Sequence, residues 1–169
     1  LAVQAKENSL LVGCSTNCYF TEETLEELGG LIDFMNVGVK GYSNSIYRTC
    51  GAKSSTPVFR NIAGLLEMGV HVETSVVYSR RNEADVLQAA RTLSKVSSEI
   101  PLQLMRFIPF GDTPLEQEPS IGDAERLCRA IREHMDHVYL FNSPGTELLH
   151  TYCPQCGSLL AEREFHGPM

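Results

Sequence analysis

Hydrophobic residues follow two different spacings along the chain, and the two alternate. Short runs rich in aliphatic and β-branched residues occupy positions 10–15, 34–40, 70–78, 102–110 and 137–141. In the gaps between them, apolar residues recur every three or four positions, as on the buried face of an amphipathic helix. Strand-like runs that alternate with helical runs are typical of βα repeats. The pattern therefore predicts an α/β fold with a parallel sheet.

The residues that precede the helical runs support this assignment. Thr21, Thr56 and Asn82 can each cap the run that follows, and Ser120 or Asp123 can cap the last one. Glutamates fill the first turn after Thr21, where negative charge stabilises a helix N-terminus, and a Gly-Gly pair ends that run. We therefore expect a helix to begin directly after each cap.

Polar residues that follow the predicted strands are candidates for ligand binding, because parallel sheets bind ligands at the carboxyl ends of their strands. Lys40 ends an apolar strand. Its ammonium can neutralise a carboxylate or phosphate, or it can be a surface lysine that opens a loop. The first strand contributes three further candidates, which are Ser15, Thr16 and Asn17.

Two charged residues lie inside predicted strands. Arg106 alternates with Leu104 and Ile108, so it shares a strand face with apolar residues. A charged group on such a face must be paired or must meet an anionic ligand. Glu73 lies in mid-strand among valines and is expected to face the same interior. Both are therefore candidate binding residues.

Among the six cysteines, only Cys153 and Cys156 have the two-residue gap of a metal knuckle. Their compact turn can present two thiolates to zinc or iron, but a tetrahedral site needs two more ligands. His150 and Tyr152 lie close by in the sequence. A redox pair or two idle thiols are the alternatives. Cys14 is expected to point into the core.

Composition narrows the class of protein. The chain has 169 residues, of which 43% are hydrophobic and 21% charged, as in a single globular domain. It has no run of about 18 apolar residues, so a membrane-spanning protein is not expected. Its net charge of −7 argues against general nucleic-acid binding. The cysteines without a secretory signal indicate a reducing cytoplasm. The chain begins with Leu1 and soon reaches a strand, which suggests a processed or truncated product and leaves a missing N-terminal segment open.

Several strings, taken in order, resemble a known family. They are Ser15-Thr16-Asn17-Cys18-Tyr19-Phe20-Thr21, Asn36-Val37-Gly38-Val39-Lys40, Cys50-Gly51-Ala52, Val138-Tyr139-Leu140-Phe141-Asn142-Ser143-Pro144-Gly145 and Thr151-Tyr152-Cys153-Pro154-Gln155-Cys156-Gly157. This combination resembles the radical S-adenosylmethionine (radical SAM) enzymes similar to pyruvate formate-lyase activating enzyme. The last two strings look like the AmmeMemoRadiSam branch. The resemblance covers about residues 10–160 and begins at about the third strand of the family.

The resemblance implies a fold and a chemistry. Residues 1–145 would form part of a TIM-like (βα)6 barrel, truncated at its N-terminus, and residues 146–169 a C-terminal tail with the Cys-Pro-Gln-Cys knuckle. In the family, a [4Fe–4S] cluster reduces SAM to a 5′-deoxyadenosyl radical, which abstracts a hydrogen atom from the substrate. The Cys-x3-Cys-x2-Cys cluster loop and the Gly-Gly-Glu motif are absent from this sequence. The chain therefore resembles the C-terminal part of such an enzyme and lacks the cluster ligands.

By position in the family pattern, Ser15, Thr16 and Asn17 would lie along the bound SAM, and Lys40 would meet its carboxylate side. Glu73 and Arg106 complete the set of candidate cofactor-binding residues. Three residues depart from the pattern: Gly38 stands in place of aspartate, Cys18 in place of glycine and Ile108 in place of histidine.

Two other interpretations remain open. The chain can be a non-catalytic βα module that uses a zinc knuckle at Cys153 and Cys156 for protein association. It can also be a cluster-free α/β enzyme that binds an anionic small molecule through Lys40 and Arg106. The substrate, a small molecule or a protein, is left open. An exposed edge at the first strand is expected, to be covered by an oligomer or by a missing segment.

Overall fold

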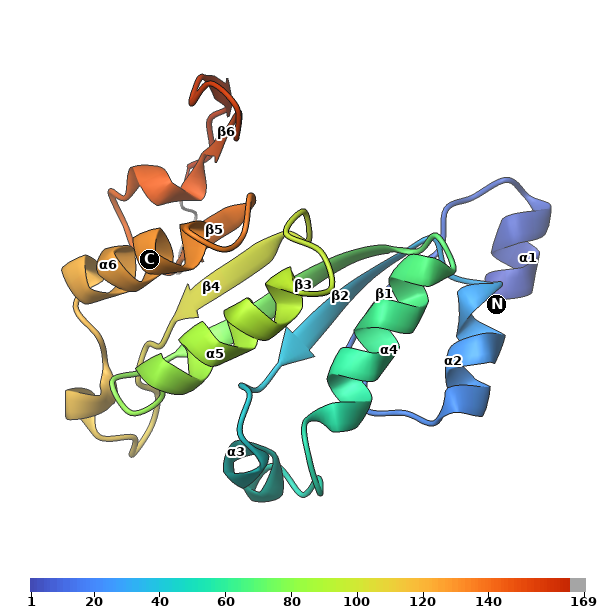
Figure 1. The fold of residues 1–169 in the computed structure, drawn as a ribbon, viewed down its shortest axis with the longest axis horizontal. Coiled ribbons are helices and arrows are strands. Elements are labelled where there is room, and N and C mark those ends of the chain that lie inside the picture. The colour runs from blue at the N-terminus through green and yellow to red at the C-terminus, as the bar shows by residue number, and fades with distance from the viewer. Residues whose placement is uncertain (165–169) are drawn as a thin grey trace. The chain divides into compact units, whose positions relative to one another are not determined.

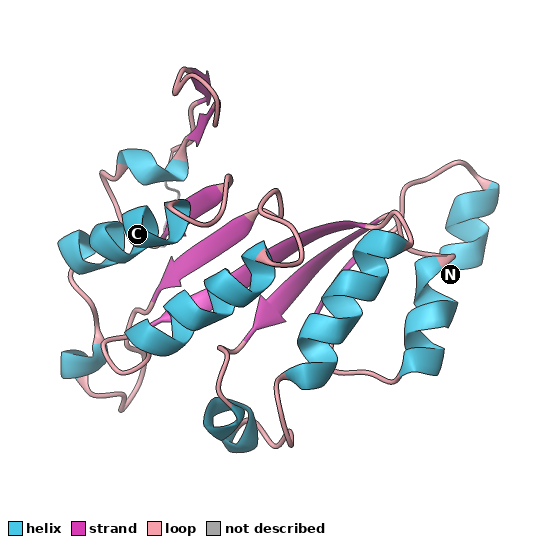
Figure 2. Ribbon diagram, viewed as in Figure 1, coloured by secondary structure: helices cyan, strands magenta, loops and turns pink. Residues whose placement is uncertain are grey.

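A computed structural model describes residues 1–164 and contains a five-stranded parallel sheet (Figure 1). In spatial order its strands are β1 (Gly13–Thr16), β2 (Phe34–Val39), β3 (His71–Tyr78), β4 (Leu102–Arg106) and β5 (Val138–Phe141). Each connection between successive strands contains at least one α-helix (Figure 2). The predicted α/β fold of parallel βα repeats is thus confirmed. The chain divides into two compact units, residues 1–75 and 76–169.

The first unit combines β1, β2 and most of β3 with four helices. These are α1 (Ala2–Glu7), α2 (Glu22–Gly29), α3 (Asn44–Thr49) and α4 (Thr56–Glu67). The helices α2 and α4 pack closely at Gly64, because a Cβ atom at this position would lie 2.7 Å from Leu25 Cδ2. In contrast, α1 has no buried residue.

The core of the first unit lies on one face of its sheet. In β2, the buried residues Met35, Val37 and Val39 alternate with residues that face the other way. The apolar stripe of α4 supplies three buried side chains, Val58, Ile62 and Leu65. The opposite face of β1 and β2 is left partly exposed, and Ser15 lies on it.

The second unit contains the end of β3, β4, β5 and the helices α5 (Glu83–Ser94) and α6 (Ile121–Arg132). Two short 3₁₀ helices, η1 (Leu115–Gln117) and η2 (Glu147–Leu149), lie in its connections. An antiparallel pair, β6 (Thr151–Tyr152) and β7 (Leu159–Ala161), forms a separate hairpin. The predicted apolar face of α5 is buried, as is that of α6; these faces consist of Val86, Ala89, Ala90 and Leu93, and of Ala124, Leu127 and Ile131.

The helix caps largely match their predictions. The Thr21 hydroxyl accepts a hydrogen bond from the Thr24 amide at 3.3 Å, and Ser120 forms a reciprocal capping box with Asp123. Asn82 is also the N-cap residue of its helix, although its side chain makes no capping bond there. The predicted start at Thr56 is one residue late, since Ser55 occupies the cap position.

Three predictions about the strands and core need correction. The first strand begins at Gly13, not at residue 10, and Leu10 is exposed. The fourth strand ends at Arg106, so Ile108 does not continue its face and is exposed. Cys14 is exposed, not in the core, because it lies on the outermost strand of the sheet order. The helices α1 and α3 lie in segments for which no helix was predicted.

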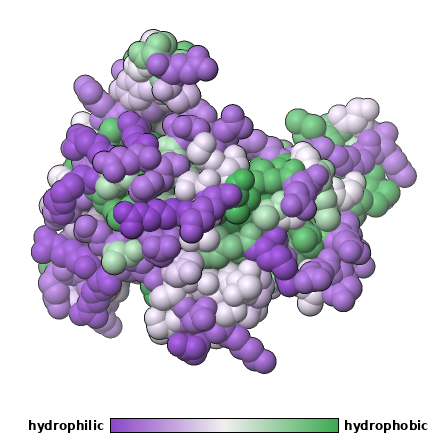
Figure 3. All heavy atoms as spheres, viewed as in Figure 1, coloured by the Kyte–Doolittle hydropathy of each residue, from purple (hydrophilic) through white to green (hydrophobic). Residues whose placement is uncertain are grey.

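None of the helices in residues 1–164 has the length and apolar character needed to cross a bilayer. On the face seen in Figure 3, hydrophilic side chains cover most of the surface, and hydrophobic ones gather in limited areas. The residues from 165 onward, which belong to the predicted C-terminal tail, lie outside the described part of the chain.

Candidate functional site

Some of the predicted binding residues lie on the partly exposed face of the sheet in the first unit. The parallel register places Gly13 beside Phe34 and Ser15 beside Asn36. Because side chains alternate along a strand, Ser15 and Asn36 lie on the face opposite the buried Met35. Ser15, one of the predicted binding residues, therefore shares this face with Asn36, which was not among them.

A hollow of about 500 Å³ lies on this face and contains both Ser15 and Glu73. His71 also lines it, and its Nε2 lies 3.5 Å from Glu73 Oε1. At the next outward-facing position of β3, the Ser75 hydroxyl donates to Asn36 Oδ1 at 3.4 Å. The hollow is therefore lined by polar groups of both donor and acceptor type, contributed by three neighbouring strands.

A second, smaller hollow of about 130 Å³ contains Asn17 and Lys40 together with Tyr19, Tyr47 and Cys50. The backbone amide of Lys40 donates to the Tyr47 hydroxyl at 3.4 Å. Within residues 1–164, however, no hydrogen bond or ion pair reaches the Lys40 ammonium. The hollow therefore has an uncompensated positive charge at its wall.

Asn17 adds a second available donor to this hollow. Its side-chain oxygen accepts a hydrogen bond from the Tyr19 amide at 3.0 Å, as in an Asx-turn. This bond fixes the side chain and leaves the Nδ2 group without a partner in the described residues. An ammonium and an amide N–H₂ in one small hollow are suited to binding an anionic oxygen ligand.

Gly38 lies close to Lys40 and offers no side chain to its ammonium. A Cβ atom at position 38 would lie 3.5 Å from Lys40 Nζ and 3.7 Å from the Thr16 carbonyl oxygen, which is ordinary contact distance. A side chain would therefore fit there and would project toward the ammonium. Because glycine has no side chain, this position lacks the carboxylate that the resembling family has there. The Lys40 ammonium is therefore not neutralised by residue 38.

Thr16 plays a different part from its two neighbours. It pairs in register with the buried Val37, so it belongs to the opposite face of the sheet. Its hydroxyl oxygen accepts a hydrogen bond from the Cys18 amide at 3.0 Å. Thr16 therefore holds the loop after β1 and does not line either hollow.

The loop after β1 turns at Cys18. This residue is fully buried and has a φ of 57°, a left-handed conformation that favours glycine. Burial raises the pKa of its thiol to about 12, so the sulfur behaves as an apolar group at neutral pH. The positive φ gives a physical reason for the glycine that the resembling family has at this position.

The side chain of Asn61 in α4 forms hydrogen bonds with the same loop. This residue was not among those predicted from the sequence. Its buried side-chain amide donates to the carbonyl oxygens of Cys18 and Phe20, both at 2.9 Å. Arg60 donates to Asn61 Oδ1 at 3.1 and 3.0 Å and pairs with Glu22 at 2.7 Å. The signal was present, because Asn61 lies three residues after Val58 and four before Leu65, on the apolar stripe of the helix.

Arg106 lies in the second unit and is fully engaged there. Its guanidinium forms an ion pair with Glu118 and donates to the carbonyl oxygens of Asn142 at 2.8 Å and Pro119 at 3.1 Å. The Asn142 amide donates back to the Arg106 carbonyl at 3.0 Å. Of the two environments expected for this charge, the structure has the internal pairing.

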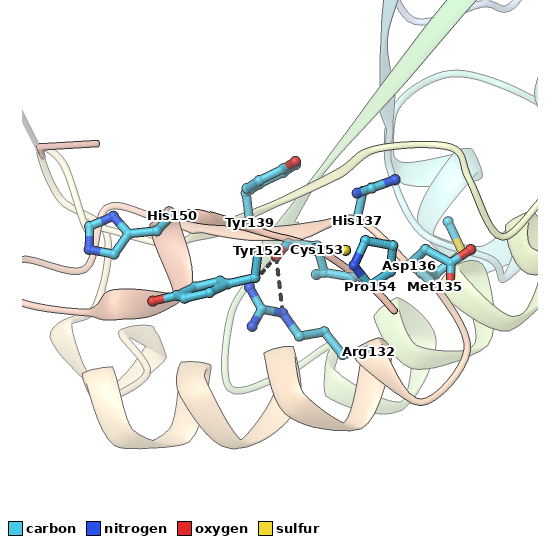
Figure 4. Close-up of a pocket in the computed structure, with 10 residues that line it drawn as sticks. Arg132, Met135, Asp136, His137, Tyr139, His150, Tyr152, Cys153 and Pro154 are labelled. Atoms are coloured by element: carbon cyan, nitrogen blue, oxygen red, sulfur yellow. Dashed lines mark hydrogen bonds between the residues drawn. The ribbon is translucent and has the colours of Figure 1, made fainter. Parts of the chain in front are cut away.

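Cys153 lies at the edge of a hollow of about 220 Å³ in the second unit (Figure 4). Arg132 crosses this hollow, and its guanidinium donates to the Val138 carbonyl at 3.2 and 2.8 Å. Cys156 is exposed, and hydrogen bonds from Ser158 lower the pKa of its thiol. In residues 1–164 no three His, Cys, Asp or Glu side chains are grouped to hold a metal ion.

Comparison with known proteins gives one sequence relative and several structural ones. No family model matches the chain. An uncharacterized protein of Methanocaldococcus jannaschii is 32% identical over 169 residues, which cover 96% of this chain and 49% of the relative. The chain thus spans about half the length of the curated relative that it matches.

Three solved structures have a similar fold. A domain of pyruvate-formate lyase-activating enzyme from Bacteroides vulgatus has a TM-score of 0.64 at 12% identity, over 82% of this chain and 86% of that one. SuiB of Streptococcus suis, bound to its precursor peptide SuiA, has a TM-score of 0.64 at 14% identity, over 88% and 35%. Native anSMEcpe with bound AdoMet has a TM-score of 0.54 at 14% identity, over 78% of this chain and 39% of that one. The chain therefore has the α/β fold found in pyruvate-formate lyase-activating enzyme and in these two larger proteins.

Proposed function

We propose that the chain is part of a radical SAM enzyme of the kind that includes pyruvate formate-lyase activating enzyme, and that its first unit supplies part of the SAM-binding face. The observation that carries this proposal is the unpaired Lys40 ammonium, which shares a hollow with Asn17 at the carboxyl ends of β1 and β2. The fold supports it, since one similar structure holds AdoMet. The AmmeMemoRadiSam branch is the finer assignment that the sequence strings favour.

Lys40 and Asn17 have the chemistry to hold the carboxylate end of SAM. An ammonium and an amide N–H₂ both donate hydrogen bonds, and neither has another partner within residues 1–164. Ser15 and Glu73 line the larger hollow, which shares no lining residue with the Lys40 hollow, so a hydroxyl and a carboxylate there suit ribose hydroxyls, away from the carboxylate and amino end of the ligand. When bound, SAM would supply hydrogen-atom abstraction after its reductive cleavage. This chain's own residues bind and orient it.

The iron–sulfur cluster of the family does not fit this chain. Three thiolates of one loop are needed, whereas the sequence has no Cys-x3-Cys-x2-Cys motif and the described residues contain no group of three possible ligands. Cys18 is buried, with a thiol pKa raised to about 12, which disfavours the thiolate that a metal requires. In the proposed enzyme, the cluster is therefore held by residues outside this sequence.

The roles of the remaining candidates follow from their partners. Arg106 already neutralises Glu118 and binds two carbonyl oxygens. We therefore assign it a structural role in the second unit, and ligand binding is its secondary role. Thr16 positions the loop after β1 through the Cys18 amide. The substrate class and any protein partner stay open.

Anaerobic isolation of the protein from its own host, followed by iron analysis and a SAM cleavage assay, tests the proposal. We expect four irons per protein and the release of methionine from SAM upon reduction. A protein without iron that still binds SAM or another anion would contradict the proposal and favour a cluster-free enzyme. A protein with zinc and without iron or SAM cleavage would favour the association module.

A further inference from the structure

Three separate segments of the first unit form the small hollow that contains the Lys40 ammonium. Asn17 and Tyr19 belong to the loop after β1, Lys40 directly follows β2, and residues 50–52 form the third segment. Helix α3 lies between the second segment and the third (Figure 1). Because these walls come from different parts of the chain, the position of Lys40 relative to Asn17 depends on the bonds that join the segments.

The chain next to Lys40 has little conformational restraint of its own. The strand β2 ends at Val39, and Gly41 has a φ of 144°, in the region that favours glycine. Because glycine adopts many backbone conformations, Gly41 does not by itself fix the direction of the chain after Lys40. Contacts from other segments must therefore hold the backbone of Lys40 in place.

Tyr47 in α3 supplies such a contact. Its side chain is buried, and its hydroxyl accepts a hydrogen bond from the Lys40 backbone amide at 3.4 Å. The backbone carbonyl of Tyr47 accepts hydrogen bonds from the Cys50 amide at 3.0 Å and the Ala52 amide at 2.9 Å. This one residue thus joins Lys40 to the wall that residues 50–52 form.

Tyr19 makes the corresponding contact for the loop after β1. Its hydroxyl accepts a hydrogen bond from the Lys53 backbone amide at 3.1 Å, and its own amide donates to Asn17 Oδ1 at 3.0 Å. Both ligand-binding candidates of the hollow are therefore tied through a tyrosine to residues 50–53. Of the two tyrosines, Tyr47 is the one whose hydroxyl contacts Lys40 itself.

We propose that Tyr47 is a positioning residue of this hollow, whose hydroxyl holds the backbone of Lys40 so that the ammonium and the Asn17 amide meet one anion together. The inference rests on the proposed function, because that function assigns the same hollow to the carboxylate of SAM. A lysine side chain is long and flexible, so freedom of its backbone adds to the entropy that is lost when an anion binds. Removal of the tyrosine hydroxyl would therefore weaken binding through Lys40.

Titration with sodium sulfate, followed by NMR of the backbone amides, tests the inference without SAM or a cluster. We expect Tyr47→Phe, which removes only the hydroxyl, to weaken sulfate binding about fivefold. The amide proton resonance of Lys40 should shift in the same variant, because its hydrogen bond is lost. Tyr42→Phe is the matched control, since Tyr42 lies in the same connection but does not line the hollow, and it should bind sulfate like the unaltered protein.

Combination with Lys40→Ala separates positioning from a general structural role. If Tyr47 acts through Lys40, Lys40→Ala weakens sulfate binding and Tyr47→Phe has no further effect in that background. An unchanged sulfate affinity in Tyr47→Phe, or the same loss with and without Lys40, would overturn the inference and leave the Lys40 site intact. An unchanged sulfate affinity in Lys40→Ala would instead contradict the proposed function and this inference with it.

Discussion

Lys40 and Arg106 lie at similar positions relative to their strands, but their charges have different partners in the folded chain. Each is a basic residue at the end of an apolar strand, Lys40 directly after β2 and Arg106 as the last residue of β4. Arg106 is 8% exposed, and its guanidinium has three partners. Lys40 is exposed, and within residues 1–164 its ammonium has none.

The difference comes from the segments that follow each strand. After β4 the chain runs through Glu118 and Pro119, whose carboxylate and carbonyl oxygens satisfy the arginine. Near Lys40 the corresponding neighbour is Gly38, which has no side chain to offer. A basic residue at a strand end is therefore a binding candidate only when no group of the surrounding chain neutralises its charge. By this criterion Lys40 is a better binding candidate than Arg106.

The largest expected effect tests whether Arg106 is structural. Replacing it by Met would leave the Glu118 carboxylate and two carbonyl oxygens without their donor. We expect a loss of about 3 kcal/mol in the free energy of unfolding, because an ion pair and two hydrogen bonds to carbonyl oxygens are lost together. Lys40→Met, which removes an exposed and unpaired charge, should change it by less than about 0.5 kcal/mol. Urea unfolding of both variants measures the two changes in unfolding free energy. Equal losses would contradict the different roles assigned to Arg106 and Lys40.

The next effect concerns the loop that carries Asn17. Asn61→Ala would leave the buried carbonyl oxygens of Cys18 and Phe20 unsatisfied, at a cost of about 2 kcal/mol in unfolding free energy. It should also weaken ligand binding in the first unit, since the loop loses its support. Asn8→Ala is a suitable control, because Asn8 is exposed. A variant as stable as the unaltered protein would remove Asn61 from this role.

A smaller effect is expected at Cys18. Cys18→Ala and Cys18→Gly both delete the buried sulfur, but only glycine adopts the φ of 57° without strain. The glycine variant should therefore be more stable than the alanine variant by about 1 kcal/mol. Thermal unfolding of the two proteins compares them directly. If alanine proved the more stable, the loop conformation assigned to this position would be wrong.

Gly38→Asp would turn the environment of Lys40 into one like that of Arg106. The space at position 38 accepts a side chain, and a carboxylate there would neutralise the ammonium. We expect the affinity of this hollow for a small inorganic anion such as sulfate to fall about fivefold, which corresponds to about 1 kcal/mol. Gly38→Asn, of similar size and without charge, is the control and should have a weaker effect. Equal effects of the two variants would point to steric blocking.

The smallest effect is the response of the two units to acid. A hydrogen bond from Lys6 holds the pKa of Asp33 below its ordinary value in the first unit, and one from Ser120 does the same for Asp123 in the second. A carboxyl with a lowered folded pKa adds stability above its unfolded pKa, and this stability is lost as pH falls below about 4. Asp33→Asn and Asp123→Asn should each flatten that part of the stability profile. A profile unchanged in both variants would contradict the assignment.

The sequence predicted the repeating elements well, because helices and strands leave periodic patterns that local physics explains. The buried stripe of α5 and the capping box at Ser120 are examples. It predicted Lys40 and Arg106 equally as binding residues, because the partners of Arg106 lie 12 to 36 positions away in the chain. It misplaced Cys14, since the pattern of a strand does not reveal that the strand lies at the edge of the sheet.

Calorimetric titration of SAM into the anaerobically isolated protein tests the central claim most directly. Lys40→Ala is compared with Lys95→Ala, which removes another exposed lysine at the end of α5. If the open charge of Lys40 binds the ligand, Lys40→Ala weakens SAM binding at least about tenfold and Lys95→Ala leaves it unchanged. Equal affinities of all three proteins would contradict the account and remove Lys40 from the site.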